Sequence, residues 1–343
     1  MQRFSTRVIA WQRLHGRHTF PWQVSRDPYR IWLSEIMLQQ TQVATVIPYF
    51  LRFVARFPDL PTLADANEDE VLALWSGLGY YSRARNLHLA ARRVMTEYGG
   101  QFPEALHHIE SLPGVGRSTA AAIAALAFGQ TKAILDGNVK RVLTRHAGID
   151  GWPGDPAVAS RLWALAEARL PAKYIEPYTQ GMMDLGATVC TRTRPACSAC
   201  PVAGDCKALH LGLTGRLPSA KPKKTMPEKK VQMLIVRNGT KTLLEKRPRN
   251  GIWGGLWSFP ELESDSDPIE HCKFVLGLST NHAFSLPPVR HCFTHYRLYI
   301  SPIVLNLVPE TASALMAHQQ WFAPQEVLHA ALPAPVRKLL LQL

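Results

Sequence analysis

The sequence is short of acidic side chains, has few cysteines outside one stretch, and contains no long uninterrupted hydrophobic run. Its 343 residues carry 26 acidic against 39 basic side chains, a formal net charge of +13. An enzyme of small neutral metabolites does not need this excess, whereas a polyphosphate ligand or an anionic membrane surface would attract it. The longest apolar runs, such as IWLSEIML, are short and interrupted, so we expect neither a spanning helix nor a membrane partner.

The N-terminal stretch MQRFSTRVIAWQRLHGRHTF lacks the apolar core of a secretory signal. Six cysteines are present, and four of them cluster between residues 190 and 206. Clustering of this kind favours a metal or metal-cluster site in a reducing compartment over a disulfide framework. Cys272 and Cys292 stand alone and are expected to be free thiols.

The stretch LPGVGRSTAAAIAALAFGQTKAILDGNVKR, residues 112–141, combines a Gly-rich turn between two helices, a small-residue helix and an acidic turn. Gly114 and Gly116 can adopt positive φ and allow a polyanion to approach closely. The helix that follows directs free N–H groups outward. Asp136 opens the next helix, where it is either a cap or a catalytic carboxylate. The three features in this order indicate a site that contacts a phosphate backbone.

Hydrophobic periodicity and capping residues predict helices over 4–15, from Asp27-Pro28 onward, after Asp136, and over 43–56, 67–76, 82–98, 104–110, 118–128, 156–168 and 174–186. Glu35 lies inside the apolar pattern of the second helix, just before a Gln-Gln-Thr-Gln cluster at 39–42. A carboxylate among apolar neighbours is desolvated, and desolvation raises its pKa. A surface position or a structural salt bridge is the usual explanation for a lone helical Glu. Here a poised acid beside amides indicates a pocket that handles a nucleobase.

The segment Gly77-Leu78-Gly79-Tyr80-Tyr81 is predicted to be a flexible turn with one aliphatic and two aromatic side chains. These side chains either fill the core or form a wedge that enters a base stack. Two arginines, at positions 83 and 85, follow directly and favour the wedge.

The clustered cysteines follow the spacing C-x6-C-x2-C-x5-C at Cys190, Cys197, Cys200 and Cys206. Four thiolates can hold a structural zinc ion or a [4Fe-4S] cluster. Zinc ribbons more often use two C-x-x-C pairs, and only one is present here. Basic residues in and beside the loop suit contact with phosphate.

A change in composition marks a domain boundary after residue 214. The segment GRLPSAKPKKTMPEK, rich in Pro and Lys, predicts a semi-extended linker over 215–229. VQMLIVRNGTKTLLEKRP then predicts a β-hairpin across Asn238-Gly239. A helix near 268–277, strands near 291–307 and a C-terminal helical stretch complete an α+β domain over 230–343. The sequence therefore predicts a mainly α domain over 1–214, a linker and a smaller α+β domain.

Together these motifs resemble the helix-hairpin-helix superfamily of base-excision DNA repair enzymes, and within it the MutY-type adenine DNA glycosylases. The hairpin at about 104–128, the cysteine loop at 190–206 and the second domain carry the resemblance, which covers nearly the whole chain. It implies a [4Fe-4S] cluster on the four cysteines and a Nudix-like second domain. No REUXEE-type helix follows Phe259-Pro260-Glu261-Leu262, so the Nudix box is missing and a recognition role is expected.

The resemblance implies a monofunctional glycosylase that flips adenine out of a duplex and hydrolyses its N-glycosidic bond opposite 8-oxoguanine or guanine, leaving an abasic site. Glu35 would be the general acid, and Asp136, supported by Asn138, would stay ionised and stabilise the sugar cation. We expect opposite surroundings for the two carboxyls, apolar for Glu35 and polar for Asp136. The expected partner is double-stranded DNA with A:8-oxoguanine or A:G mispairs. The protein is expected to be a monomer in the bacterial cytoplasm, at the nucleoid through DNA, or in another reducing compartment.

The resemblance also implies DNA-binding residues. Positions lining the adenine pocket correspond to Trp22, Gln23, Ser118 and Gln180. Wedge and opposite-base positions correspond to Gln40, Thr41, Leu78, Gly79 and Tyr80. The hairpin contributes Gly114 and Gly116, and the loop that senses 8-oxoguanine corresponds to Phe293, Thr294 and His295, where the family usually has Phe-Ser-His.

Three alternatives remain open. A bifunctional endonuclease III-like glycosylase and AP lyase carries a Schiff-base lysine directly after the Arg of the hairpin, where this sequence has Ser118. A non-enzymatic iron–sulfur DNA-binding or redox-sensing module would have no need of both Glu35 and Asp136. Hydrolysis of oxidised nucleotides by the second domain is opposed by its missing carboxylate box.

Overall fold

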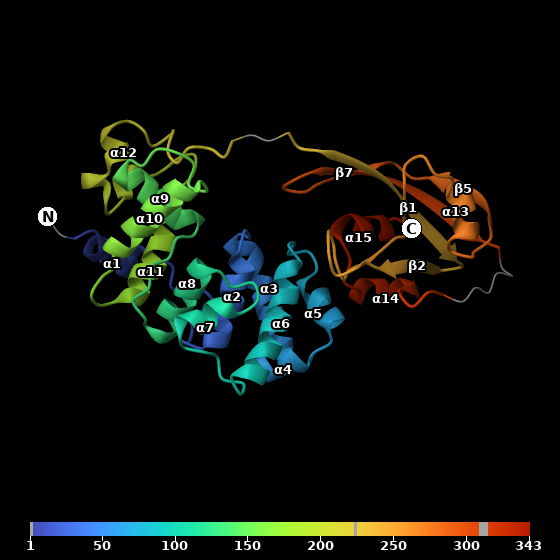
Figure 1. Ribbon diagram of the computed structural model, residues 1–343, viewed down its shortest axis with the longest axis horizontal. Helices are drawn as coiled ribbons and strands as arrows, with labels where there is room; N and C mark the ends of the chain where they lie inside the picture. The colour runs from blue at the N-terminus through green and yellow to red at the C-terminus, as the bar shows by residue number, and fades with distance from the viewer. Residues whose placement is uncertain (1–2, 223–224, 309–314) are drawn as a thin grey trace. The chain divides into compact units, whose positions relative to one another are not determined.

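The structure, a computed structural model, describes residues 3–222, 225–308 and 315–343. It forms two compact units, one of Met1–Asp65 and Asn86–Lys223, the other of Ala66–Arg85 and Lys224–Leu343. The first unit is helical, and the second combines helices with one sheet (Figure 1). The predicted fold class is thereby confirmed. The expected linker contains the point where the chain passes to the second unit, which also includes residues 66–85.

The first unit is built from helices that agree with the predicted ones to within a few residues. They are α1 Phe4–His15, α2 Pro28–Leu38, α3 Val43–Arg56, α4 Leu60–Asp65, most of α6 Ser82–Glu97, α7 Leu106–Ser111, α8 Arg117–Phe128, α9 Gly137–Ala147, α10 Pro156–Ala168, α11 Ile175–Asp184 and the short α12 Lys207–His210. The short α4 and α12 have no counterpart among the predictions. A π-helical turn, Leu185–Val189, continues α11 toward the cysteines.

Capping residues explain where several of these helices begin and end. The side chain of Asp27 accepts a hydrogen bond of 3.0 Å from the Tyr29 amide, and Pro28 takes the first helical position of α2. Asp155 and Pro156 repeat this arrangement at α10. Gly129 ends α8 with a φ of +66°, a left-handed conformation that glycine adopts without strain.

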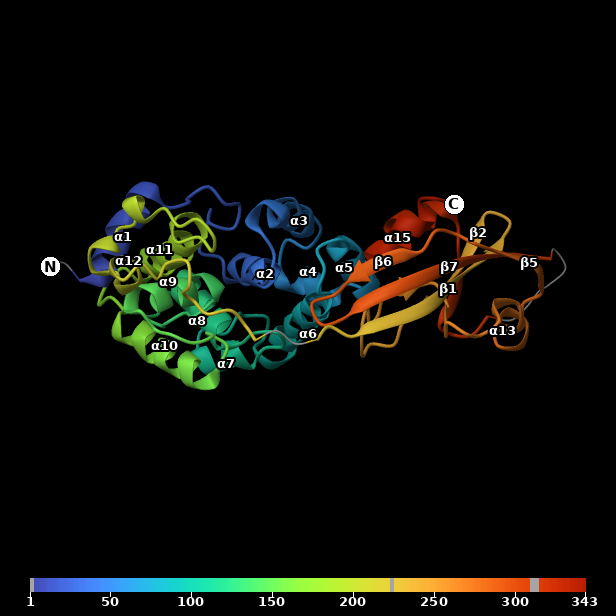
Figure 2. The ribbon, with the colours of Figure 1, turned by 90° about the horizontal axis from the view of Figure 1, so that it is seen from above.

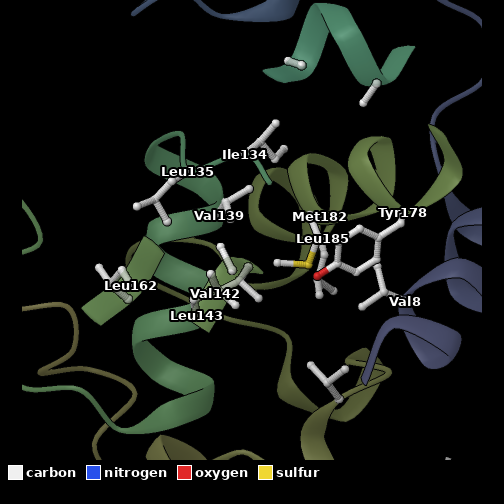
Figure 3. Packing of buried hydrophobic residues seen from close by; sticks show 14 of the residues in the cluster. Val8, Ile134, Leu135, Val139, Val142, Leu143, Leu162, Tyr178, Met182 and Leu185 are labelled. Carbon is white, nitrogen blue, oxygen red and sulfur yellow. The ribbon is translucent and has the colours of Figure 1, made fainter. Parts of the chain in front are cut away.

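One hydrophobic core holds α1, α8, α9, α10 and α11 together. Figure 3 shows Met182 and Leu185 between Val8 of α1 and Val142 of α9, all of them buried. Leu135, which directly precedes Asp136, is buried in the same core. Burying each such side chain stabilises the fold by roughly 1.5–3 kcal/mol. The core therefore fixes the start of α9 and the face of α11 relative to each other.

The second unit contains a mixed sheet with the strand order β3-β2-β1-β7-β5, to which β4, β6 and β8 add at β1, β7 and β2. The strands are β1 Glu228–Asn238, β2 Lys241–Lys246, β3 Trp257–Ser258, β4 Glu261–Leu262, β5 Thr280–Ser285, β6 Val289–Cys292, β7 Arg297–Leu307 and β8 Gln319–Phe322. The helices are α5 Glu68–Trp75, α13 Pro268–Phe274, α14 Pro324–His329 and α15 Ala334–Leu340. Pairing of Asn238 with Lys241 confirms the predicted hairpin.

The long strands β1 and β7 run side by side and parallel (Figure 2). Leu234, Val236 and Leu305 contribute to the core of this unit, and Cys272 of α13 packs into it. None of the six cysteines, all within the described residues, forms a disulfide, as predicted for Cys272 and Cys292. Within the described ranges, no helix is both long enough and apolar enough to cross a bilayer.

Candidate active site

The first unit contains a cavity of about 1050 Å³ between α2, α8, α9, α11 and the turn that follows α1. Many of the residues singled out from the sequence line it, although they are spread over more than 150 positions of the chain. They are Trp22, Gln23, Glu35, Gln40, Thr41, Ser118, Asp136, Asn138 and Gln180. Both candidate catalytic carboxyls thus face the same space.

Glu35 projects from α2 among buried apolar residues such as Ile31 and Ile36. Burial, and after it the negative charge of Asp136, raises the pKa of Glu35 to about 8. Among the described residues, none donates a hydrogen bond to its carboxyl group that would favour the ionised form. At neutral pH Glu35 is therefore protonated and able to give up a proton.

Asp136 is the N-cap of α9. Its Oδ1 accepts from the Val139 amide at 2.8 Å, and its Oδ2 accepts from Asn138 Nδ2 at 3.3 Å. Burial raises the pKa of Asp136, while these two hydrogen bonds and the charge of Arg141 lower it. The expected polar surroundings of Asp136 are confirmed by these hydrogen bonds, but burial also raises its pKa, as it does for Glu35. The two carboxyls differ because only Asp136 receives hydrogen bonds and a nearby positive charge.

Arg141 ties the catalytic turn to the segment before the cysteines. Its Nη2 donates to Asn138 Oδ1 at 2.8 Å and to the Gly186 carbonyl at 2.6 Å, and its Nε donates to the Cys190 carbonyl at 2.6 Å. Gly186 lies in the π-helical turn, where an added Cβ would come within 2.5 Å of Asn138 Cβ. The turn can therefore pack against Asn138 only with glycine at this position.

Aromatic and polar side chains complete the cavity wall. Trp22 stacks on Phe20 with ring centroids 5.1 Å apart and meets Phe50 edge-on at 5.3 Å. Gln23 uses both ends of its amide on its own turn, accepting from the Phe20 amide and donating to the Arg17 carbonyl. Ser118 Oγ accepts from the Leu135 amide at 2.9 Å. Gln23 and Ser118 thus fix the backbone around the cavity.

The Gly-rich turn lies outside the cavity. Gly114 has a φ of +79°, and an added Cβ there would approach Asn86 Cβ to 2.9 Å, so glycine is required. Gly116 has a φ of −99° and is the N-cap of α8, so the left-handed conformation expected from the sequence is absent at this residue. The space around it is open, with no atom within 4 Å of an added Cβ. Close approach of a polyanion remains possible there.

The four clustered cysteines line one small cavity together with Val142, Arg145 and Val202. Arg145 Nη1 lies 3.4 Å from Cys190 Sγ and donates to the Thr191 carbonyl at 2.7 Å, which holds the loop in place. Burial raises the pKa of the Cys200 thiol to about 11. In the part of the chain that the structure describes, no three His, Cys, Asp or Glu side chains are arranged to hold a single metal ion.

Comparison with known proteins identifies the family. Residues 33–168 match the HhH-GPD superfamily of base excision DNA repair proteins, and residues 231–342 match the NUDIX domain. An adenine DNA glycosylase of Buchnera aphidicola subsp. Acyrthosiphon pisum is 37% identical over 98% of this chain and 96% of its own length. The chain belongs to the adenine DNA glycosylase family. The human adenine DNA glycosylase is 34% identical over 98% of this chain and 73% of its own length.

Two solved structures resemble part of the chain. A thermostable thymine-DNA glycosylase is 30% identical, with a TM-score of 0.56, over 61% of this chain and 95% of its own. An endonuclease III–DNA complex, 20% identical with a TM-score of 0.52 over 61% of this chain and 94% of its own, shares the fold.

The turn expected to form a wedge lies in the second unit. Leu78 is only 5% exposed, which matches the alternative in which it fills the core, whereas Tyr80 is 42% exposed. Arg83 is buried and donates to the Leu78 and Gly79 carbonyls, so it supports the turn and does not extend toward phosphate. The hydroxyl of Tyr81 donates to the Leu332 carbonyl at 3.1 Å, which joins the turn to the α+β part of the unit.

The loop expected to sense the opposite base is the turn between β6 and β7. Phe293 stacks on Tyr296 with centroids 4.7 Å apart and packs against Trp253 at 5.3 Å. Thr294 and His295 are exposed at its tip. The aromatic residues therefore hold the loop and leave these two polar side chains accessible.

Sequence reasoning missed Arg17, which lines the cavity, and Asp184, which lies behind the cavity wall. Asp184 is fully buried and accepts from the Arg17 amide, from Arg17 Nε and from Gln180 Nε2. The spacing of Gln180 and Asp184, four residues apart on one helix, is a local signal that could have found the second contact. The pairing with Arg17, 167 positions away, has no local signal.

Proposed function

We propose that this protein is a monofunctional adenine DNA glycosylase that flips adenine out of a duplex and hydrolyses its N-glycosidic bond, leaving an abasic site. Its substrates are A:8-oxoguanine and A:G mispairs, and it acts as a monomer. The observation that carries the proposal is that Glu35 and Asp136 face one cavity. The family membership supports the choice of adenine.

Glu35 supplies the proton. Adenine is a poor leaving group until it is protonated, and a carboxylic acid with a pKa of about 8 still holds its proton at neutral pH. After the bond breaks, the Glu35 carboxylate accepts a proton from the attacking water. The single residue thus acts first as an acid and then as a base.

Asp136 stabilises the sugar as positive charge develops on it. The Val139 amide and Asn138 hold its carboxylate in a fixed orientation, so little reorganisation is needed during the reaction. The positive charge of Arg141 favours the ionised form of Asp136. Trp22 supplies an aromatic wall for the flipped base, and Gln180 reads it through its amide.

The serine at position 118 is inconsistent with lyase chemistry. A lyase needs an amine at the sugar carbon to form a Schiff base, and a serine hydroxyl cannot form one. Here the hydroxyl oxygen of Ser118 accepts from the Leu135 amide and is engaged in positioning the turn before Asp136. The reaction therefore stops at the abasic site.

Cys190, Cys197, Cys200 and Cys206 are proposed to hold a [4Fe-4S] cluster, since the four thiols line one small cavity and Arg145 can donate to a ligand sulfur. When bound, the cluster supplies structural cross-linking of the loop. Through the Cys190 carbonyl and Arg141, the loop is connected to Asn138.

DNA contacts outside the cavity are proposed at three places. Gly114 and Gly116 contact phosphate, and Gln40 and Thr41 lie at the cavity rim where the strands are separated. Tyr80 contacts the base stack of the duplex. Gly79 provides the turn that carries it, and the buried Leu78 anchors this turn. Phe293, Thr294 and His295 sense the base opposite adenine.

Single-turnover assays on defined duplexes test the proposal. Adenine opposite 8-oxoguanine should give alkali-labile sites, more slowly when the opposite base is guanine. Strand nicking without alkali together with a borohydride-trapped covalent complex would establish a lyase instead. For the cofactor, iron and sulfide analysis with a broad absorbance near ~400 nm supports the cluster, and a colourless zinc protein refutes it.

A further inference from the structure

Asp184 is a fully buried carboxylate to which the mechanism above gives no role. It is the last residue of α11, one helical turn beyond Gln180. Its oxygens accept from the Arg17 amide at 2.9 Å, from Arg17 Nε and Nη2 at 2.7 Å each, and from Gln180 Nε2 at 3.0 Å. Arg17 and Gln180 both line the cavity, and Asp184 lies behind them.

The carboxylate of Asp184 determines the orientation of the Gln180 side-chain amide. A carboxylate paired with a guanidinium is ionised and can only accept hydrogen bonds. Gln180 must therefore direct its NH₂ group toward Asp184, because the opposite orientation would bring two acceptors together. Within the described residues nothing donates to Gln180 Oε1, so the cavity wall presents a hydrogen-bond acceptor at this point.

The ion pair also fixes the turn that carries the aromatic wall. The Arg17 carbonyl accepts from Gln23 at 3.1 Å, and the Arg17 guanidinium lies 4.9 Å from the centroid of Phe20, which stacks on Trp22. One carboxylate thus orients the amide and the aromatic surface against which a flipped base would lie.

We propose that Asp184 is a positioning residue that determines base specificity: it holds the Gln180 amide with its oxygen toward the base, as an acceptor for an exocyclic amine. A 6-aminopurine satisfies this acceptor. A 6-oxopurine places its own acceptor against it, which leaves two unpaired polar groups in the occupied cavity. The inference rests on the proposed function, since it concerns the base bound in that cavity.

The test compares three bases in otherwise identical duplexes: adenine, hypoxanthine and unsubstituted purine, each opposite 8-oxoguanine. Unsubstituted purine has no group at C6 and is insensitive to the orientation of the amide. In Asp184→Asn, the new side chain can donate, so Gln180 can turn. The ratio of the excision rate of adenine to that of unsubstituted purine should fall roughly ten- to a hundredfold. The excision rate of hypoxanthine should rise relative to that of adenine.

If the role of Asp184 is merely structural, excision of all three bases should slow equally. An unchanged ratio of adenine to unsubstituted purine excision in Asp184→Asn would overturn the inference. In a Gln180→Ala background, Asp184→Asn should leave the ratio as it is, because the amide through which it acts is gone. Glu97→Gln, which removes an exposed partner of Arg93 on α6, is the matched control and should leave the ratio at the wild-type value.

Removing one partner of a buried pair can prevent folding. Should Asp184→Asn not fold, the double variant Arg17→Gln with Asp184→Asn removes both charges and should show the same fall in the ratio. The two proposals fail in distinguishable ways. If wild-type protein does not release adenine, the proposed function is wrong, whereas normal adenine release with an unchanged ratio in the variants contradicts only the role of Asp184.

Discussion

Glu35 on α2 and Asp136 at the start of α9 face the same cavity, and the charge of Asp136 adds to the burial that raises the pKa of Glu35 to about 8. A proton shared between these positions resides on Glu35, because Asp136 alone receives hydrogen bonds from Val139 and Asn138. Because only Asp136 receives these hydrogen bonds, Glu35 acts as the acid and Asp136 as the anion.

Replacing Glu35 by Gln should abolish proton donation with little change in shape. We expect the excision rate to fall by at least roughly 10²–10⁴-fold, the usual contribution of a general acid. Binding of the mispaired duplex should be largely kept, because the carboxyl is neutral at neutral pH. Single-turnover rates and a duplex-binding titration measure the two effects, and unchanged excision would rule out Glu35 as the acid.

The raised pKa of Glu35 predicts how activity and stability depend on pH. Excision should decline as the pH rises through about 8, where Glu35 loses its proton. The folded state holds this proton up to about 8 and the unfolded chain only to about 4.5, so stability decreases with rising pH across this window. Melting temperatures of wild type and Glu35→Gln, measured below and above the window, should diverge in favour of the variant at the higher pH.

Arg141→Met tests the connection between the cysteine loop and the catalytic turn. It removes charge-assisted hydrogen bonds to Asn138 and to the Gly186 and Cys190 carbonyls. Excision should slow by roughly ten- to a hundredfold. Because the Arg141 charge lowers the pKa of Asp136, the acid limb of the rate profile should also shift to higher pH. A slower enzyme with an unshifted acid limb and normal iron content would contradict this role.

Phe293→Ala should loosen the loop between β6 and β7, since it removes the stacking on Tyr296 and the contact with Trp253. With about 0.5–1.5 kcal/mol for such an aromatic pair, we expect the preference for A:8-oxoguanine over A:G to fall roughly three- to tenfold. The rate on A:G should change little. Phe284→Ala, at an exposed position on β5, is the control. Phe293→Ala is a more specific test than deletion of 230–343, because the deletion would also remove the contact of the turn around Tyr81 with Leu332.

Local signals in the sequence account for most of the fold. The helix over 4–15 and the hairpin at Asn238-Gly239 follow from periodicity and turn chemistry, which act over a few residues. The strands β5 and β8 were not predicted, because they depend on pairing with distant partners. The parallel pairing of β1 with β7 likewise joins residues about 70 positions apart, and nothing local encodes it.

The candidate site was predictable where residue type carries the chemistry and unpredictable where packing decides it. The carboxyl of Glu35 in an apolar run indicated its raised pKa. The polar sequence around Asp136 predicted its hydrogen-bonded surroundings, but not that the core beneath α9 also buries it. Gly116 was expected to have positive φ because glycine permits it, yet capping α8 requires an extended conformation instead. The ion pair of Arg17 with Asp184 required the tertiary structure.

Ser118→Lys tests whether the residue at position 118 alone determines whether the enzyme has lyase activity. Ser118 lines the cavity with Glu35 and Asp136, so an amine there lies beside the sugar once the base is bound. We expect strand nicking without alkali and a borohydride-trapped complex, neither of which the wild type should give. The change also removes the acceptor for the Leu135 amide, so adenine release should slow. Ser118→Ala loses the same acceptor without gaining an amine, and should slow release without any trapped complex. Trapping by both variants would point to another amine, such as Lys132 or Lys140, as the nucleophile.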